Sequence, residues 1–318
     1  MGKLLGIFVV VALAFALAAC SDDPAITTAP TGGSATASIG AVAFPVTVTG
    51  TNGDVTIDSR PERIVSLSPT ATEDLFAIGA GDQVIAVDDQ SNYPADVPTT
   101  DLSGFEPNVE AIAGYEPDLV VFATEPGDLG SSLEGLGITA LQLDAAPNLG
   151  VAYDQIEQLG AATGHVDESA ALVEQMRSDI QGLGVDGADP ATGVSFYYEL
   201  DDTFYSVTSK TFIGQLLRML GLENIADAVG KGSGGYPQLS AEYIIESDPD
   251  LIFLADTKCC GQSLETVSHR PGWHELTAVT GGDVVPLNDD VASRWGPRII
   301  DLLRRISDAA DSAEANAA

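Results

Sequence analysis

The chain has 318 residues, 45% of them hydrophobic, which is enough for one large or two medium globular domains. Its formal net charge is −34, with 13 lysines and arginines against 47 aspartates and glutamates. Such an acidic chain repels nucleic acid and anionic lipid headgroups, so a nucleic-acid partner is not expected. Adaptation to salt and adaptation to an exposed environment both remain open as reasons for the charge.

The N-terminus has the pattern of an export signal. Lys3 precedes an apolar run, Leu4 to Ala16, that is too short to span a membrane comfortably. The next four residues, Leu17-Ala18-Ala19-Cys20, resemble the lipobox of bacterial lipoproteins, which implies removal of residues 1–19 and acylation of Cys20. An ordinary signal peptide with a chance cysteine is the alternative. Residues 20–40 are small, polar and rich in proline and glycine, which predicts a flexible tether.

Residues 41–150 alternate between short strand and helix patterns. The expected elements are a hairpin around Asn52-Gly53, strands at 63–67, 83–87 and 119–122, a helix from Ser68 to Ile78 and another from Asn108. Strands that alternate with short helices indicate an α/β lobe with a largely parallel sheet.

Residues 151–186 carry no strand signal. Val173, Met176, Ile180 and Leu183 form one apolar stripe of a long helix that begins near Asp167. We therefore expect a helical segment here that connects the first lobe to whatever follows.

Residues 187–318 return to the alternating pattern. The expected elements are strands at 194–200 and 284–287, a helix closed by Gly221, and a terminal helix with Ile299, Leu302, Leu303 and Ile306 on one side. The chain is therefore predicted to form two α/β lobes with a helical segment between them.

One helix-turn-strand sequence occurs twice, as "VEAIAGYEPDLVVF" from Val109 and "AEYIIESDPDLIFL" from Ala241. Glu110 matches Glu242, at an offset of 242 − 110 = 132 residues. Each glutamate is the second residue of a helix capped by asparagine or serine, where the helix dipole stabilises it by about 0.3–1 kcal/mol. Local helix stabilisation is the simple interpretation. The matching positions favour a second one, a docking surface for a partner with two basic sockets.

These motifs together resemble the ferric-siderophore and cobalamin class of ABC-transporter substrate-binding proteins. The resemblance extends from about Phe44 to Leu303 and rests most on "SLSPTATEDLFAIGAG" and on the doubled Glu…Pro-Asp-Leu pattern. It implies a class III periplasmic-binding-protein-like fold, in which one long rigid helix joins two α/β lobes and the ligand cleft lies between them. It also implies that Glu110 and Glu242 dock against arginines of the membrane permease.

The same resemblance implies a set of ligand-binding residues: Ser68, Tyr93, Phe105, Tyr205, Tyr236, Arg294 and Trp295. Aromatic faces with a few polar groups suit a large, partly flat metal chelate, and Arg294 would attract an anionic chelate or a corrinoid. Simple lobe packing is the alternative for each aromatic residue. The family's cobalamin binders carry tryptophan where Tyr236 stands, so the chelate stays open. Arg298 is expected to pair with a nearby carboxylate, and Trp273 to lie in the core.

Cys259 and Cys260 are adjacent, and three alternatives stay open for them: a vicinal disulfide, two buried thiols or a soft-metal site. His165, His269 and His274 match no metal-ligand pattern. No metal site, catalytic residue or resident cofactor is therefore expected, although heme coordination through a tyrosine or histidine stays open.

The sequence thus predicts a lipid-anchored, extracytoplasmic and monomeric binding protein, at the cell surface or in the periplasm. It would capture an iron-siderophore or cobalamin-type chelate and deliver it to the permease and ATPase subunits of an ABC importer. A heme or metal-ion receptor of the same fold is the alternative. A secreted α/β enzyme is disfavoured, because no Gly-x-Ser-x-Gly or His-Glu-x-x-His motif is present.

Overall fold

A computed structural model describes residues 43–184 and 193–317. The expected export signal at 1–19, the tether at 20–40 and the acylation site at Cys20 lie outside the described residues. Within the described ranges, none of the helices combines the length and the apolar character needed to cross a membrane.

The chain enters the fold as the predicted hairpin. Strands β1 (Val46–Gly50) and β2 (Gly53–Ile57) pair antiparallel across Gly53, whose φ of 101° only glycine adopts readily. The Asn52 side chain ties the turn to a neighbouring sheet: it donates to the carbonyl of Ala140 at 3.0 Å and accepts from the N–H of Gln142 at 3.0 Å.

The first lobe is built on a five-stranded parallel sheet. Its strands, in spatial order, are β5 (Thr99–Leu102), β4 (Val84–Asp88), β3 (Ile64–Leu67), β6 (Leu119–Phe122) and β7 (Thr139–Gln142). The connections contain α1 (Pro69–Ala77), η1 (Gly81–Gln83), α2 (Val109–Ala113) and α3 (Leu129–Gly135). Every residue of β3 and β6 is buried, as expected for parallel strands covered on both faces.

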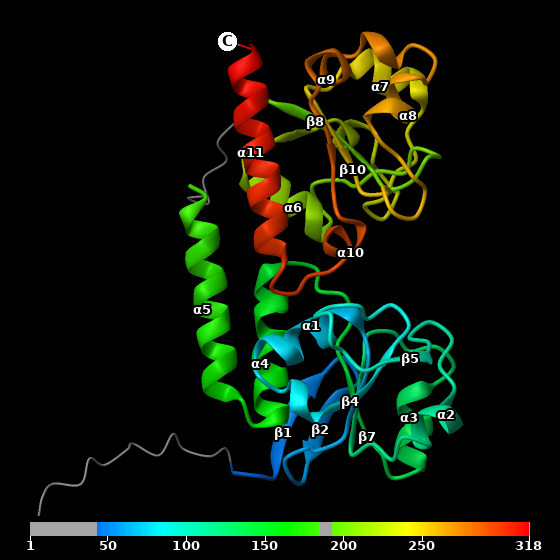
Figure 1. The fold of residues 1–318 in the computed structure, drawn as a ribbon, viewed down its shortest axis with the longest axis vertical. Helices are drawn as coiled ribbons and strands as arrows, with labels where there is room; N and C mark the ends of the chain where they lie inside the picture. The colour runs from blue at the N-terminus through cyan, green and yellow to red at the C-terminus, as the bar shows by residue number, and fades with distance from the viewer. Residues whose placement is uncertain (1–42, 185–192, 318) are drawn as a thin grey trace, which may run out of the picture. The chain divides into compact units, whose positions relative to one another are not determined.

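Two helices, not one, follow the first lobe. Helix α4 (Leu149–Thr163) ends at Gly164, which takes the left-handed conformation with φ 80°. Helix α5 (Val166–Gly182) then runs back along α4 and carries the predicted stripe of Val173, Met176 and Ile180 (Figure 1). The long helix expected from about Asp167 is thus confirmed as α5, and α4 precedes it within the predicted helical segment, the two forming a helical hairpin around Gly164.

The second lobe is built on a four-stranded parallel sheet. Its strands, in spatial order, are β11 (Val284–Pro286), β10 (Leu251–Leu254), β8 (Ser195–Glu199) and β9 (Glu223–Asn224). The helices are α6 (Phe212–Met219), η2 (Ile225–Ala228), α7 (Ala241–Ser247), α8 (Leu264–Ser268), η3 (Trp273–Glu275), α9 (Thr277–Gly281), α10 (Asp289–Ala292) and α11 (Ile299–Ala317). Trp273, expected in the core, is 1% exposed.

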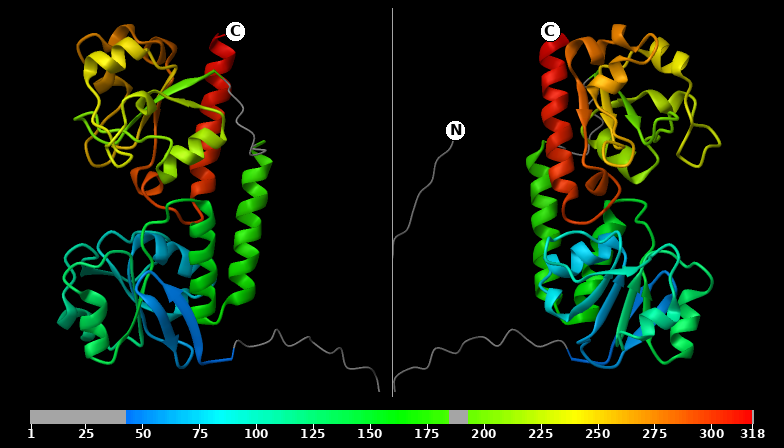
Figure 2. Two further views of the ribbon diagram at one scale, coloured as in Figure 1. Left: turned by 180° about the vertical axis from the view of Figure 1, so that it is seen from behind. Right: turned by 45° about the vertical axis from the view of Figure 1, so that its right-hand side comes forward.

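The long helices α4, α5 and α11 join the lobes through one hydrophobic core. Ile156 of α4, Met176 of α5 and Leu303 of α11 belong to a single cluster that also contains residues of both sheets. Arg304 of α11 pairs with Asp179 of α5 at 3.3 Å. Both lobes lie on the same side of these helices, one beyond the other along the chain's long axis (Figures 1 and 2). The predicted fold class, two α/β lobes connected by long helical structure, is confirmed.

Candidate ligand-binding cleft

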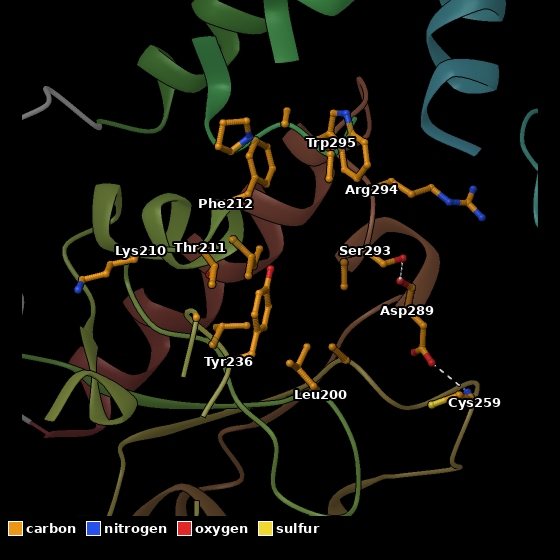
Figure 3. Close-up of a pocket in the computed structure, with 18 residues that line it drawn as sticks. Leu200, Lys210, Thr211, Phe212, Tyr236, Cys259, Asp289, Ser293, Arg294 and Trp295 are labelled. Atoms are coloured by element: carbon orange, nitrogen blue, oxygen red, sulfur yellow. Dashed lines mark hydrogen bonds between the residues drawn. The ribbon is translucent and has the colours of Figure 1, made fainter. Parts of the chain in front are cut away.

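A cavity of about 610 Å³ lies where the two lobes meet. Its walls come from three regions: residues 145–147 between β7 and α4, the carboxyl-end loops of the second sheet, and residues 289–295 before α11. Ligands bind to open α/β sheets at the carboxyl ends of the strands, so this position is the expected one. Three aromatic side chains, Phe212, Tyr236 and Trp295, face it from different sides (Figure 3).

A smaller cavity of about 330 Å³ adjoins the first, mainly on the side of the first lobe. Ser293, Arg294 and Trp295 line both cavities, so the two form one cleft divided by this segment. Ser68 and Phe105 line the smaller part. Ser68 also caps α1 by accepting the N–H of Ala71 at 3.3 Å, whereas Phe105 is 73% exposed.

Five of the seven predicted ligand-binding residues therefore line the cleft: Ser68, Phe105, Tyr236, Arg294 and Trp295. The other two contribute no wall to either cavity. Tyr93 packs against Arg298, with the guanidinium carbon 4.2 Å from its ring centre. Tyr205 pairs with Gln238 in an isolated antiparallel bridge, and its side chain is exposed.

Arg294 is held differently from what the sequence suggested. Its side chain is only 8% exposed, and its guanidinium donates to Glu73 at 2.7 Å, to Asn92 at 3.1 Å and to the carbonyl of Gln90 at 2.9 Å. Figure 3 shows the guanidinium directed away from Tyr236. The charge expected to attract an anionic chelate is thus already neutralised by a buried carboxylate.

Three wall residues that the sequence reading missed are Leu200, Lys210 and Phe212. Lys210 and Phe212 flank Thr211, which caps α6 by accepting the N–H of Gly214 at 3.1 Å. The sequence did contain a signal for this wall: Thr211 is an N-cap residue directly before the apolar run of α6. Loops between a parallel strand and the following helix often line ligand clefts, so the residues beside this cap were candidates. The ammonium group of Lys210 is directed away from the cavity centre (Figure 3).

Cys259 and Cys260 are free thiols, and both are exposed. Their exposure contradicts the alternative of two buried thiols, and the vicinal disulfide stays a prediction. Hydrogen bonding to Cys260, followed by burial, raises the pKa of the Cys259 thiol to about 12. No cluster of histidine, cysteine and acidic side chains suited to a metal ion occurs among residues 43–184 and 193–317.

Asp289 holds the loop of Cys259 and Cys260 in place through hydrogen bonds. Its carboxylate accepts the N–H groups of Thr257, Lys258 and Cys259 at 2.8–3.0 Å and the Thr257 hydroxyl at 2.7 Å. Burial acts to raise the pKa of Asp289, but these hydrogen bonds outweigh it and the pKa lies below its usual value. The ionised Asp289 therefore holds the Cys259 wall of the cavity in place.

The repeated glutamates stand on equivalent helices. Glu110 lies in the first turn of α2, capped by Asn108, and Glu242 in the first turn of α7, capped by Ser240. Both side chains are exposed. Helices α2 and α7 lie on the side of their lobes away from α5 (Figure 1).

Two lobes on a helical backbone with an aromatic cleft between them define a bilobal binding protein. Residues 64–291 match the family described as periplasmic binding protein. The chain is 30% identical over 275 residues to an uncharacterised ABC transporter substrate-binding lipoprotein of Bacillus subtilis, YvrC, covering 83% of this chain and 85% of that one. It is 32% identical over 282 residues to a cobalamin-binding protein of Halobacterium salinarum, covering 85% and 75%.

A solved structure agrees with these relatives. The periplasmic vitamin B12 binding protein BtuF of Vibrio cholerae superimposes with a TM-score of 0.63 at 25% identity, over 79% of this chain and 97% of that one. The chain belongs to the periplasmic binding protein family. It is a solute-binding receptor of an importer, as the sequence predicted.

Proposed function

We propose that this receptor is the extracytoplasmic substrate-binding component of an ABC importer and that its cargo is an uncharged metal chelate of the corrinoid or ferric-hydroxamate type. The observation that carries the choice of cargo is the electrostatics of the cleft. Phe212, Tyr236 and Trp295 supply flat apolar area. The two cations in the wall, Lys210 and Arg294, direct their charged groups away from its centre (Figure 3).

Charge also argues against anionic cargo. Glu73 neutralises Arg294 at 2.7 Å, and the carboxylate of Asp290 lies 3.5 Å from the same guanidinium. A ferric tris-catecholate or a heme with two propionates would bring negative charge into a cleft where Arg294 is already paired and the Lys210 ammonium points away from the centre. An uncharged chelate with many amide groups meets no such penalty. The names of the Halobacterium and Vibrio relatives support the corrinoid.

Docking to the permease is assigned to Glu110 and Glu242. Both carboxylates are exposed on capped first turns of equivalent helices, one in each lobe, so each is available to a basic side chain of a partner. Glu242 also borders a surface pocket with Phe204, Arg270 and Trp273. We assign the ATPase as the third component, which the receptor itself does not need to contact.

The export signal and Cys20 support a lipid anchor on the outer face of the membrane, and the name of the Bacillus relative supports the same assignment. The acyl chains would hold the protein there, and residues 21–40 would act as the tether. We further propose that the receptor works as a monomer and returns its cargo chemically unchanged, so that it is not an enzyme.

A ligand screen tests the proposal. The mature protein is titrated with cyanocobalamin, a ferric trihydroxamate, a ferric tris-catecholate and hemin, and binding is followed by tryptophan fluorescence and by absorbance retained after gel filtration. Stoichiometric, unaltered binding of the first or second chelate is the expected result. Preferential binding of hemin or the catecholate would contradict the choice of cargo, and turnover of any chelate would contradict a receptor.

A further inference from the structure

Glu73 on α1 contacts two arginines that come more than 200 residues later. Its Oε1 accepts from Arg294 Nη1 at 2.7 Å, and its Oε2 accepts from Arg298 Nε at 2.7 Å. Arg298 Nη2 also donates to Oε1. The carboxylate side chain is only 2% exposed. One buried carboxylate of the first lobe therefore binds both ends of the segment 294–298, which leads from α10 into α11.

The other strong contacts of the two arginines also come from the first lobe. Arg294 donates to Asn92 and to the carbonyl of Gln90, and Arg298 lies over the ring of Tyr93. Trp295 stands between them in sequence, and its indole N–H donates to Gln155 Oε1 of α4 at 2.8 Å. The position of Trp295 in the cavity wall is thus set by first-lobe and α4 groups.

No other carboxylate replaces Glu73 in this arrangement. Asp74 is its neighbour on α1, but burial, together with the charge of Glu73, raises the pKa of Asp74 well above its usual value. Asp290 approaches Arg294 at 3.5 Å and also pairs with Lys258 at 2.9 Å. Among the described residues, Glu73 is the carboxylate that contacts both guanidinium groups.

Removing the charge of Glu73 would leave two poorly solvated guanidinium groups with too little negative charge. A buried cation without a partner is strongly unfavourable, so it moves toward water or an anion. For Arg294 the nearest open space is the cleft, because this residue lines both of its cavities.

We propose that Glu73 is a specificity-determining residue of the cleft: it withholds the charge of Arg294 from the cavity and fixes Trp295 in its wall, so that uncharged chelates bind in preference to anionic ones. This inference rests on the proposed function, namely that the cleft binds a metal chelate. Glu73 acts through Arg294 and Trp295 and need not touch the cargo.

The first test compares the binding of two probes to three proteins, the wild type and two variants. Cyanocobalamin is the uncharged probe and a ferric tris-catecholate is the anionic one. The proteins are the wild type, Glu73→Gln and Glu134→Gln. Glu134 is exposed on α3 and gives the same change in net charge. Glu73→Gln should shift the ratio of the two dissociation constants about tenfold toward the catecholate, and added salt should reduce the shift. Glu134→Gln should leave the ratio unchanged.

The double variant Glu73→Gln with Arg294→Gln provides the matched control, because it removes the released charge as well. It should lose the gain for the catecholate. Equal weakening of both probes by Glu73→Gln would show a structural role alone and would overturn the proposal. A catecholate gain that persists in the double variant would also overturn it, since Arg294 could then not be its source.

A second measurement needs no ligand. The chain has two tryptophans, so a Trp273→Phe background leaves Trp295 as the sole indole emitter. Adding Glu73→Gln should shift the emission to longer wavelength and increase quenching by acrylamide, whereas Glu134→Gln should do neither. Unchanged emission would overturn the positioning of Trp295. If Trp295 responds while wild type binds neither probe, the proposed function fails and the role of Glu73 in positioning stands.

Discussion

Asp118 and Asp250 make the same contact in the two lobes. Asp118 accepts the N–H groups of Glu62 at 2.8 Å and Arg63 at 3.0 Å, just before β3. Asp250 accepts both the N–H of Ser195 at 2.8 Å and its hydroxyl at 2.7 Å, at the start of β8. Each aspartate thus joins the repeated helix-turn-strand unit to the backbone where the neighbouring strand begins, a shared role that accounts for the repeated Pro-Asp-Leu.

Replacing Asp250 should destabilise the fold without changing the cleft. Asp250→Ala leaves the N–H and the hydroxyl of Ser195 without their charged acceptor, and we expect a loss of about 2 kcal/mol in the free energy of unfolding. Asp118→Ala should cost less, since Asp118 is more exposed than Asp250. Urea unfolding measures both effects, with the exposed Asp96→Ala as control. Equal stability of all four proteins would disprove this role.

The two exposed glutamates should matter for transport but not for binding. We expect Glu110→Ala combined with Glu242→Ala to keep the affinity for cargo, because neither residue lines the cleft. Uptake into cells should be abolished, and each single variant should be intermediate. Radiolabelled uptake and equilibrium titration distinguish the two steps. Normal transport by the double variant would remove the docking role.

Tyr236 should contribute directly to affinity. Its ring lines the larger cavity and is 52% exposed, so it has little packing within the lobe to lose. Tyr236→Ala should weaken cargo binding by about tenfold or more, whereas Tyr236→Phe should change it little, since the ring face provides most of the contact. Calorimetric titration checks both variants. Undiminished affinity of the alanine variant would place the cargo elsewhere.

Asp256 should make stability depend on pH. Its side chain is 0% exposed, neither carboxylate oxygen has a hydrogen-bond partner, and Glu199 beside it is held by Arg270 at 2.6 Å. Burial, then the charge of Glu199, raises the pKa of Asp256 to about 7, whereas unfolded aspartate titrates near about 3.9. The folded protein therefore keeps a proton that the unfolded chain releases. This stabilising contribution is complete below about pH 4 and is lost as pH rises through about 7.

Asp256→Asn should remove that dependence, because an amide cannot ionise. Relative to wild type, the variant should gain stability between about pH 4 and pH 7 and then level off, as measured by urea unfolding at each pH. Asp96→Asn serves as the control with an exposed carboxylate. Parallel stability profiles for wild type and Asp256→Asn would contradict the assignment.

The sequence predicted the periodic parts of this molecule well. The hairpin at Asn52-Gly53, the capped helices that start after Asn108 and Ser240, and the stripe from Val173 to Ile180 all depend on local residue preferences. The antiparallel packing of α4 on α5 was not predicted, because a helix start near Asp167 does not by itself show whether the chain turns back.

The cleft was predicted in part, for a different reason. Residues carried over by position identified Tyr236 and Trp295, but the pairing of Arg294 with Glu73 joins positions 221 residues apart. Nothing local in either sequence segment indicates that contact. It arises only when α1 of the first lobe and the segment before α11 are brought together, so a free arginine was expected where a neutralised one exists.

The segment that holds Trp295 belongs to the second lobe by connectivity and to the first lobe by its hydrogen bonds. The lobes are therefore fastened at their base, and a wide spontaneous opening would have to break a sheltered ion pair. We expect the isolated receptor to release its cargo slowly, even when the surrounding solution contains no free cargo. Release of the cargo would then require the membrane complex to separate the two lobes. The dissociation rate measured for the isolated receptor would therefore be lower than the rate of delivery during transport.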